Sequence, residues 1–348
     1  MMTQTLKVGL VGYGMAGKAF HAPLIEATPA LELTAVVSGD ADKVKADLPS
    51  VEVLPKAAML FARADIDLVV IVTPNDTHFA LAKAALGAGK HVVVDKPLTI
   101  TLSEARLLKS LATNAQCMLS VFHNRRWDSD FLALQEVIAA GELGRVASLE
   151  SRFDRFRPMV PADRWCERHQ PGSGIWYDLG PHLLDQAILL FGMPKAVFVE
   201  LSALRDGAQV DDDFLAMLAY DHKRVVLQAG TLAAEETPRF RVNGTRGSFV
   251  KFGLDPQEGW LKEGRRPTPE WGVDPWPGRL TLENGEAGFS ERRAPSPPGD
   301  YLAYYAGIAS ALLEGTPPPV SVDEAIAVMT LLEVGLDSHR QKRWINLK

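Results

Sequence analysis

The sequence predicts an α/β protein: an N-terminal doubly wound parallel (Rossmann) sheet, then a C-terminal α+β domain with a largely antiparallel open sheet. Strand and helix patterns alternate up to about residue 122, a glycine-rich turn follows the first strand, and the later strand patterns have few helices between them. A chain of 348 residues, 47% of them hydrophobic, is long enough for two domains with real cores. We place these domains at residues 1–122 and 123–348.

The first half carries short apolar segments rich in β-branched residues, which are typical of strands buried on both faces. Strands are expected at residues 6–11, 31–37, 67–72, 91–94 and 117–122, and helices at 15–27, 78–87 and 103–114. Strands joined through helices form βαβ units, so this sheet is expected to be parallel.

The second half has a different order of predicted helices and strands. Helices are expected at 129–140, 178–191, 299–313 and 322–337, and strands at 146–156, 196–204, 214–220, 225–232, 239–243 and 247–252. Asn243-Gly244 favours a turn between the last two strands. Consecutive strands without helical crossovers indicate antiparallel pairing, whereas residues 255–298 are too rich in Pro, Gly and Trp to assign.

The composition excludes several classes of protein. A net charge of −6 argues against a nucleic-acid partner, which usually requires a basic face. The two cysteines, Cys117 and Cys166, form no C-x-x-C pair, so neither a disulfide framework nor a metal site is indicated. Residues 1–7 are too short and polar for a signal peptide, and no apolar run approaches the ~20 residues that span a membrane. We therefore expect a cytoplasmic protein with no membrane partner.

A G-x-G-x-x-G motif follows the first strand and opens a helix, which is the context that a dinucleotide-binding turn requires. Its residues are Gly12, Gly14 and Gly17, with Met15 and Ala16 between the last two. The first glycine permits the turn, the second lets the backbone approach a pyrophosphate, and the third lets helix and strand pack closely. The helix N-terminus adds free N–H groups for the phosphates. A purely structural glycine turn is the alternative.

The end of the second strand indicates the type of cofactor. An acidic residue there usually accepts hydrogen bonds from the ribose hydroxyls of NAD. Here Ser38 takes that position, and Asp40, Lys43 and Lys45 follow. A hydroxyl and nearby lysines suit a 2′-phosphate better, so NADP is favoured and NAD remains possible. In the alternative, the lysines lie on a solvated helix face and Asp40 binds the ribose.

Four segments resemble the Gfo/Idh/MocA oxidoreductase family, in particular its NADP-dependent inositol dehydrogenase-like branch. They are Thr73–His78, Asp95-Lys96-Pro97, Val121–Asp128 and Gly172–His182, and hairpin residues near Phe249 and Lys251 extend the resemblance over nearly the whole chain. The family's usual motif is Glu-Lys-Pro, so Asp95 is a departure. Another is Cys166 after Trp165, where relatives often carry an arginine that contacts the dinucleotide; Arg164 or Arg168 are candidates to compensate.

The resemblance implies hydride transfer between a nicotinamide and a small-molecule substrate: a cyclic polyol, inosose or sugar, with scyllo-inositol-like compounds favoured. It assigns His182 as general acid/base and Asp178 as its orienting or substrate-side partner. Their spacing of four residues places both on one helix face, and histidine titrates near neutral pH. Lys96, after a buried strand, would stabilise the alkoxide without a metal. From spacing alone, a first-turn structural histidine with Asp178 as the N-cap is an equally good interpretation.

The remaining candidates are less specific. The resemblance places the loop residues Thr73, Pro74, Asn75 and His78 beside the nicotinamide and ribose, and Trp165 is a further cofactor candidate. Candidates for substrate binding are His123, Asn124 and Tyr177, and Trp176 for ring stacking. Core packing is an equally good interpretation of Trp176 and Tyr177. Packing at a domain interface is an equally good interpretation of the segment that contains His123, Asn124, Arg126 and Trp127.

Two further functions use the same fold: a dinucleotide-binding sensor without turnover, and an NAD-assisted glycoside-cleaving enzyme. The joint presence of Lys96, Asp178 and His182 argues against the sensor. Family resemblance also implies a homodimer or homotetramer formed through an exposed sheet face.

Overall fold

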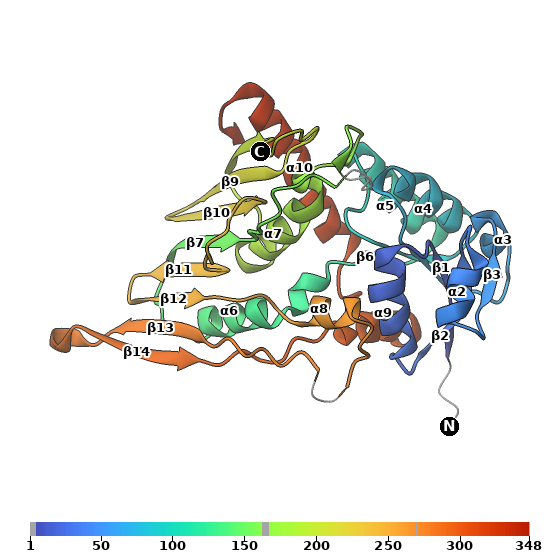
Figure 1. The fold of residues 1–348 in the computed structure, drawn as a ribbon, viewed down its shortest axis with the longest axis horizontal. Helices are drawn as coiled ribbons and strands as arrows, with labels where there is room; N and C mark the ends of the chain where they lie inside the picture. Colours follow the sequence, from blue (N-terminus) through green and yellow to red (C-terminus); the bar gives the residue numbers. More distant parts are fainter. Residues whose placement is uncertain (1–4, 162–166, 269–270, 348) are drawn as a thin grey trace. The chain divides into compact units, whose positions relative to one another are not determined.

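The computed structural model describes residues 5–161, 167–268 and 271–347. Their contacts divide the chain into two compact units, each built around one sheet (Figure 1). The first unit comprises residues 1–124, 257–271 and 300–329, and the second comprises 125–256, 272–299 and 330–348.

The first unit contains a six-stranded parallel sheet in the order β3-β2-β1-β4-β5-β6. Its strands are β1 (Leu6–Val11), β2 (Leu31–Val37), β3 (Glu52–Leu54), β4 (Leu68–Ile71), β5 (His91–Val94) and β6 (Leu119–Val121). The predicted Rossmann sheet is confirmed. The short strand β3 was missed, because three residues are too few to show a period. The strand order reverses between β1 and β4, and ligands bind at the carboxyl ends of the strands at such a point.

The helices of this unit come from both halves of the sequence. They are α1 (Ala22–Glu26), α2 (Ala41–Asp47), α3 (Ala57–Phe61), α4 (His78–Gly87), α5 (Leu102–Ala115), α8 (Gln257–Lys262) and α9 (Leu302–Glu314), with the short turns η1 (Gly17–His21) and η2 (Asn75–Thr77). The helix expected at 15–27 contains a π-helical segment, η1, before α1. Such segments are rare and frequently occur at functional sites.

The second unit contains a nine-stranded sheet in the order β14-β13-β12-β11-β7-β10-β9-β8-β15. Its strands are β7 (Val146–Arg152), β8 (Ala196–Ser202), β9 (Asp213–Tyr220), β10 (Lys223–Gly230), β11 (Phe240–Gly244), β12 (Gly247–Lys251), β13 (Gly278–Glu283), β14 (Phe289–Ala294) and β15 (Ile345–Asn346). Among the described strands of this sheet, only β7 and β10 pair in parallel, so the prediction of a largely antiparallel sheet is confirmed. Strands β13 and β14 come from the stretch that the sequence left unassigned.

The hairpin of β11 and β12 exists as expected, but Asn243 and Gly244 end β11 instead of forming the turn. The Asn243 amide donates to the Ser148 hydroxyl at 3.1 Å and accepts from the Ser248 hydroxyl at 2.8 Å. These bonds to both neighbouring strands keep Asn243 in the sheet, and the chain turns after Gly244.

Helices α6 (Ser129–Ala139) and α7 (Ile175–Phe191) belong to this unit, as does α10 (Val322–Gln341) from residue 330 onward. Helix α7 packs on β9 and β10. Trp176 anchors it, because this ring is fully buried, lies edge-on to Phe214 at 4.9 Å, and donates to the Leu332 carbonyl. Trp176 is therefore a core residue.

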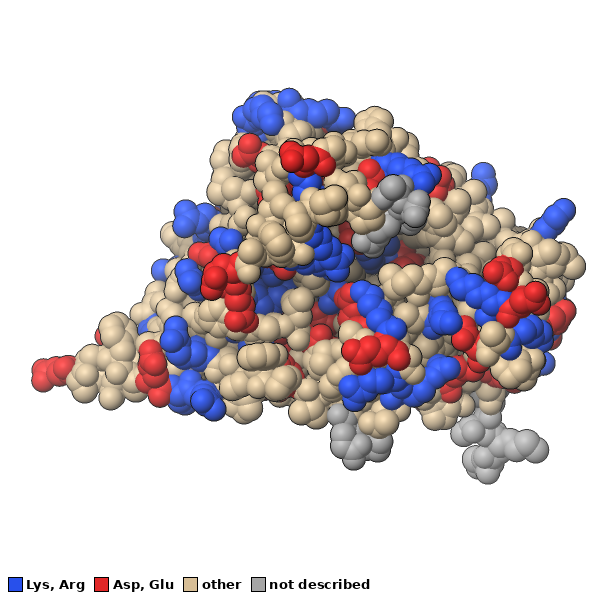
Figure 2. Space-filling view, viewed as in Figure 1, with Lys and Arg blue, Asp and Glu red and all other residues tan. Residues whose placement is uncertain are grey.

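Acidic and basic side chains are interspersed on the face shown in Figure 2. In the part of the chain that the structure describes, no helix combines the length and hydropathy needed to cross a membrane.

Candidate functional site

The three motif glycines have different environments at the end of β1. Gly12 has a φ of +101°, and a Cβ there would lie 2.2 Å from the Val72 carbonyl oxygen. A Cβ on Gly17 would lie 2.4 Å from the Gly12 carbonyl oxygen, whereas one on Gly14 would meet no heavy atom within 4 Å. Gly12 and Gly17 thus shape the turn, and Gly14 leaves its outer side open for a ligand.

A cleft of about 450 Å³ lies along this turn in the first unit. Its lining residues are Val11, Gly12, Tyr13, Gly14, Val37, Ser38, Gly39, Asp40, Lys43, Pro55 and Thr73. Met15 is 56% exposed next to it, and Ala16 is the N-cap of η1. The burial of Tyr13 and the nearby Asp47 carboxylate raise the pKa of the Tyr13 hydroxyl, so it remains neutral.

The far end of this cleft shows how Ser38 and Asp40 are used. The Ser38 hydroxyl accepts from the Asp40 backbone N–H at 3.1 Å, and an Asp40 carboxylate oxygen accepts from the Lys43 backbone N–H at 2.9 Å. Asp40 is therefore the N-cap of α2. Lys45 donates to the carbonyls of Pro49 and Val51, so of the two lysines only Lys43 lines the cleft.

The loop after β4 is held by His78. Its Nδ1 lies 2.8 Å from the Pro97 carbonyl and its Nε2 lies 2.9 Å from the Thr73 carbonyl. Burial lowers the pKa of His78 more than these carbonyls and Asp95 raise it. His78 is 0% exposed, and its contacts make it a residue that positions the loop. In that loop Asn75 is buried, Pro74 is exposed, and the Thr73 and Thr77 hydroxyls are in contact.

Asp95 and Lys96 follow β5 at the carboxyl edge of the sheet. The Lys96 backbone N–H donates to an Asp95 carboxylate oxygen at 2.8 Å, and Lys96 precedes a cis bond to Pro97. Burial would raise the pKa of Asp95, but His21, Lys96 and His78 together hold it below its ordinary value. An ionised carboxylate therefore lies next to the candidate catalytic lysine.

Asp178 and His182 both lie on α7, which begins at Ile175 with Gly174 as its N-cap. The helix thus starts three residues earlier than predicted. Asp178 is inside the first turn and is not the N-cap, and His182 lies one turn further along, so the interpretation as a cap and a first-turn histidine is wrong. His182 is 5% exposed, and Asp178 is half-buried on the same helix face.

Asp211 caps α7 from a distant part of the sequence. One of its carboxylate oxygens accepts from the Trp176 backbone N–H at 2.7 Å, and its carbonyl accepts from the Ile175 N–H at 2.8 Å. Gly174, at φ +87°, is required here because a Cβ would lie 2.2 Å from the Asp211 carboxylate. Burial raises the pKa of Asp211 to about 6, against the opposing effect of the Trp176 hydrogen bond.

A small cavity of about 50 Å³ lies beside Asp178 in the second unit. Carboxylates and guanidinium groups line it together: Arg155, Arg157, Glu167, Asp178, Arg205, Asp211 and Asp212. Of these residues, only Asp178 was identified from the sequence. The only signals there were the charged runs around 155–157 and 211–213.

Helix α7 is also fixed at its middle. The Arg126 guanidinium donates from two nitrogens to the Asp185 carboxylate, at 2.8 and 2.7 Å, and both side chains are buried. Gln186 donates to the Arg125 carbonyl and accepts from Arg239. These bonds hold one side of α7 to the segment before α6.

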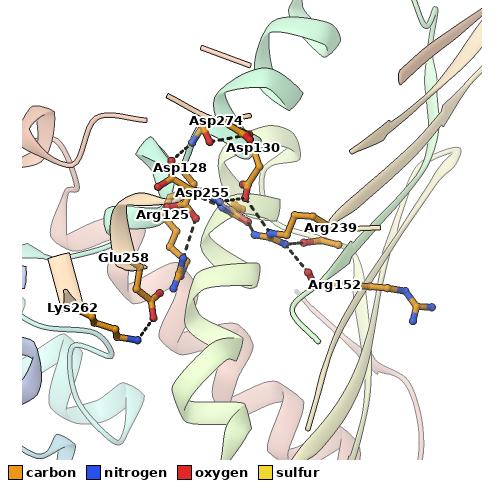
Figure 3. Close-up of polar contacts among 12 residues, drawn as sticks. Arg125, Asp128, Asp130, Arg152, Arg239, Asp255, Glu258, Lys262 and Asp274 are labelled. Carbon is orange, nitrogen blue, oxygen red and sulfur yellow. Dashed lines mark hydrogen bonds and ion pairs between the residues drawn. The ribbon is translucent and has the colours of Figure 1, made fainter. Parts of the chain in front are cut away.

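The same buried network continues away from α7 (Figure 3). Arg239 contacts Asp130 at 3.8 Å, the Asp130 carboxylate accepts from the Asp255 N–H, and Asp255 accepts from the Ser129 N–H. Lys251, part of the hairpin that carried the family resemblance, pairs with Asp274 at 2.8 Å with no exposed side-chain surface. This lysine is therefore structural.

The remaining candidates for substrate and cofactor binding lie after β6, on α7 and outside the described residues. His123 and Asn124 are buried just after β6, and Tyr177 is 9% exposed on α7. Trp165, with Arg164 and Cys166, lies outside the described residues. Within the described ranges, no group of three acidic, histidine or cysteine side chains is arranged to hold a metal.

Both parts of the chain match one family of proteins. Residues 6–123 match its NAD-binding Rossmann fold, and residues 135–347 match its C-terminal alpha/beta domain. The chain belongs to the Gfo/Idh/MocA oxidoreductase family.

Full-length relatives agree with this assignment. The chain is 56% identical to the uncharacterized oxidoreductase YdgJ of Escherichia coli over 342 residues, which cover 98% of each chain. It is 38% identical to scyllo-inositol 2-dehydrogenase (NADP(+)) IolW of Bacillus subtilis over 347 residues, or 99% of this chain and 96% of the relative. Among solved structures, the YPO2259 oxidoreductase of Yersinia pestis has a TM-score of 0.96 and 53% identity, covering 100% of this chain and 98% of that one.

The chain is therefore an NAD(P)-dependent oxidoreductase of the Gfo/Idh/MocA family. The cleft at Gly12–Gly14 fits the dinucleotide that this family binds. Its glycine turn keeps the Gly14 Cβ position open, and the start of the following helix supplies N–H groups for phosphate oxygens.

Proposed function

We propose that this oxidoreductase prefers NADP and acts on a cyclic polyol, inosose or sugar, with scyllo-inositol-like substrates favoured. The observation that carries the cofactor preference is that Asp40, which lines the cleft with Ser38 and Lys43, uses one carboxylate oxygen to cap α2. NAD is the alternative.

Charge supports this preference. A carboxylate free to accept from ribose hydroxyls would repel a 2′-phosphate at short range. One Asp40 oxygen is already occupied by the Lys43 N–H. The Lys43 ammonium lines the cleft as a cation, which suits a phosphate group. The Ser38 hydroxyl donates to the Asp40 carbonyl at 3.2 Å and brings no negative charge to the cleft.

The substrate class rests on two observations. The relative IolW is named for scyllo-inositol and NADP(+). The cavity beside Asp178 is lined by carboxylates and guanidinium groups, and a ring hydroxyl can donate to the first and accept from the second.

Each candidate residue has a defined task in this proposal. When bound, the nicotinamide accepts or returns the hydride. His182 takes the hydroxyl proton on a ring nitrogen, and the Asp178 carboxylate orients the ring and stabilises its charged form. The Lys96 ammonium donates a hydrogen bond to the reacting oxygen and favours the alkoxide.

The neighbouring candidates bind and position. Gly12, Gly14, Met15, Ala16 and Gly17 form the phosphate turn. We propose that Thr73, Pro74 and Asn75 border the nicotinamide and ribose, with His78 holding their loop. Trp165 remains a cofactor candidate, and His123, Asn124 and Tyr177 remain substrate candidates.

The test is nicotinamide absorbance with a panel of inositols, inososes and aldoses, each with NAD(H) and NADP(H). We expect turnover with NADP(H) that is lost in Lys96→Ala and in His182→Ala. Lys45→Ala is the matched lysine control, because Lys45 is held by backbone carbonyls, and it should keep full activity. Turnover with NAD(H) alone would refute the cofactor preference.

The other outcomes distinguish the alternatives. Cofactor binding without turnover of any panel compound would favour the dinucleotide-binding sensor. Retention of the cofactor through purification together with glycoside cleavage would favour the NAD-assisted glycoside-cleaving enzyme. Family membership also predicts a homodimer or homotetramer, which light scattering measures directly.

A further inference from the structure

A fully buried histidine that the proposed chemistry does not use lies beside the Asp95-Lys96 pair. His21 is 0% exposed and ends the π-helical turn η1. Its Nδ1 lies 2.6 Å from the Tyr305 hydroxyl oxygen, a hydrogen bond. Its Nε2 lies 3.8 Å from an Asp95 carboxylate oxygen, which is an electrostatic contact beyond hydrogen-bond distance. These groups form a row, the Tyr305–His21–Asp95 row, from α9 to the end of β5.

Aromatic packing holds the imidazole in this row. The His21 ring lies 4.3 Å from the Phe122 ring, centroid to centroid, and meets the Tyr305 ring edge-on at 6.2 Å. Tyr305 itself has no exposed surface. Because close-packed side chains leave little room for other rotamers, the ring keeps one nitrogen toward each partner.

The two carboxylate oxygens of Asp95 have different neighbours. One accepts from the Lys96 backbone N–H at 2.8 Å, and the other faces His21. The charged and titratable groups around Asp95 are His21 from η1, His78 from α4, Tyr305 from α9 and its neighbour Lys96. The histidines and the lysine lower its pKa against the effect of burial.

The position of a proton on His21 follows from its partners. Burial raises the pKa of Tyr305 well above its ordinary value, so the phenol stays neutral and can donate to Nδ1. A neutral ring then carries its proton on Nε2, where it points toward the carboxylate. The opposite tautomer would turn an Nε2 lone pair toward a negative charge.

We propose that His21 and Tyr305 are positioning residues for Lys96: they hold the Asp95 carboxylate in place, where it accepts from the Lys96 backbone N–H and fixes the Lys96 backbone. This inference rests on the proposed role of Lys96. It assigns a task to a histidine for which the sequence indicated none.

Adjacent tyrosines on α9 provide a matched pair of variants. Tyr304 and Tyr305 are both 0% exposed. The Tyr305 hydroxyl contacts His21, whereas the Tyr304 hydroxyl contacts the Ser120 hydroxyl at 2.9 Å. Tyr305→Phe and Tyr304→Phe therefore remove equivalent atoms, and only the first interrupts the row.

The kinetic test uses NADP with scyllo-inositol, or with whichever panel compound turns over. Tyr305→Phe should lower kcat by about two- to tenfold, the effect of one lost hydrogen bond, and leave the KM for NADP unchanged. Its acid limb of kcat should move to higher pH, because Asp95 is then easier to protonate. Tyr304→Phe should change neither. His21→Gln, which keeps a donor, should retain more activity than His21→Leu. Equal profiles for the two tyrosine variants would overturn the inference.

A spectroscopic test does not depend on activity. Nitrogen-15 NMR of the histidine side chains in the free protein should show His21 protonated at Nε2, and Tyr305→Phe should alter that signal. A ring protonated only at Nδ1 would overturn the inference. If Lys96→Ala kept full activity, the proposed role of Lys96 would fail, and the NMR result would still decide whether the row exists.

Discussion

Alanine at the first two motif glycines should separate folding from cofactor binding. Gly12 and Gly14 are two residues apart in one turn, yet their surroundings are opposite. A Cβ on Gly12 would lie 2.2 Å from the Val72 carbonyl oxygen at a φ of +101°, and a Cβ on Gly14 would meet nothing within 4 Å.

Gly12→Ala has two costs. A positive φ costs an alanine roughly 1–2 kcal/mol, and the overlap with a backbone carbonyl, which cannot rotate away, adds about 1–3 kcal/mol. The sum is about 2–5 kcal/mol. At about 2–4 °C per kcal/mol, the Tm of the free protein should fall by roughly 4–20 °C.

Gly14→Ala should leave the Tm within about 2 °C, since substitutions in open space change stability by about 0.5 kcal/mol or less. Its effect should appear in NADPH binding. A methyl group between the backbone and the pyrophosphate disturbs a charged hydrogen bond worth about 1.5–3 kcal/mol, which is roughly a 10- to 150-fold higher Kd.

Thermal unfolding without cofactor and fluorescence titration with NADPH measure the two effects separately. Wild-type affinity in Gly14→Ala would show that the pyrophosphate does not approach this glycine. A Tm loss in Gly14→Ala as large as that in Gly12→Ala would refute the geometric argument itself.

Three further predictions concern the cofactor, α7 and pH. Lys43→Ala should raise the KM for NADPH by up to roughly fivefold, because exposed ion pairs contribute about 0.2–1 kcal/mol, and leave the KM for NADH unchanged; steady-state kinetics with both cofactors test this. Arg126→Ala leaves the buried Asp185 unpaired and should cost about 3–5 kcal/mol, measured by urea unfolding; a loss below 1 kcal/mol would contradict it. Because the folded pKa of Asp211 is raised to about 6, the native state binds the extra proton, so stability should fall as pH rises from about 4 to 6. Asp211→Asn should remove this slope in Tm, and an unchanged slope would contradict its assignment to Asp211.

The fold was predictable where a pattern is local. The strands of the parallel sheet are short and largely apolar, and the glycine motif lies between a strand and a helix, so both could be predicted from the sequence. The compact unit built around that sheet also includes α8 and α9. These helices are distant in sequence, because β6 ends at Val121 whereas α8 begins at Gln257 and α9 at Leu302. No local pattern contains that information, because it depends on long-range packing such as the bond from the Ser120 hydroxyl to the Val320 carbonyl.

In the candidate site, too, local spacing was predictable and long-range contacts were not. Asp178 and His182 could be placed on one helix face from their spacing. The cap of that helix could not be identified, because Asp211 reaches it from 35 residues away. His21 was likewise uninterpretable, since its partners lie in β5 and α9. Residues that position a site from elsewhere in the chain leave no spacing signal of their own.

The row also gives a physical reason for aspartate at position 95, where the family's usual motif has glutamate. The Asp95 carboxylate already contacts the Lys96 N–H and lies 3.8 Å from the His21 ring. In Asp95→Glu, one more methylene would push the carboxylate into that ring, and overpacking of this kind costs about 1–3 kcal/mol. The cost should disappear when His21→Ala supplies room, so the two substitutions should be non-additive in a double-mutant cycle of thermal unfolding. Additive losses would show that the short carboxylate and the buried imidazole are independent of each other.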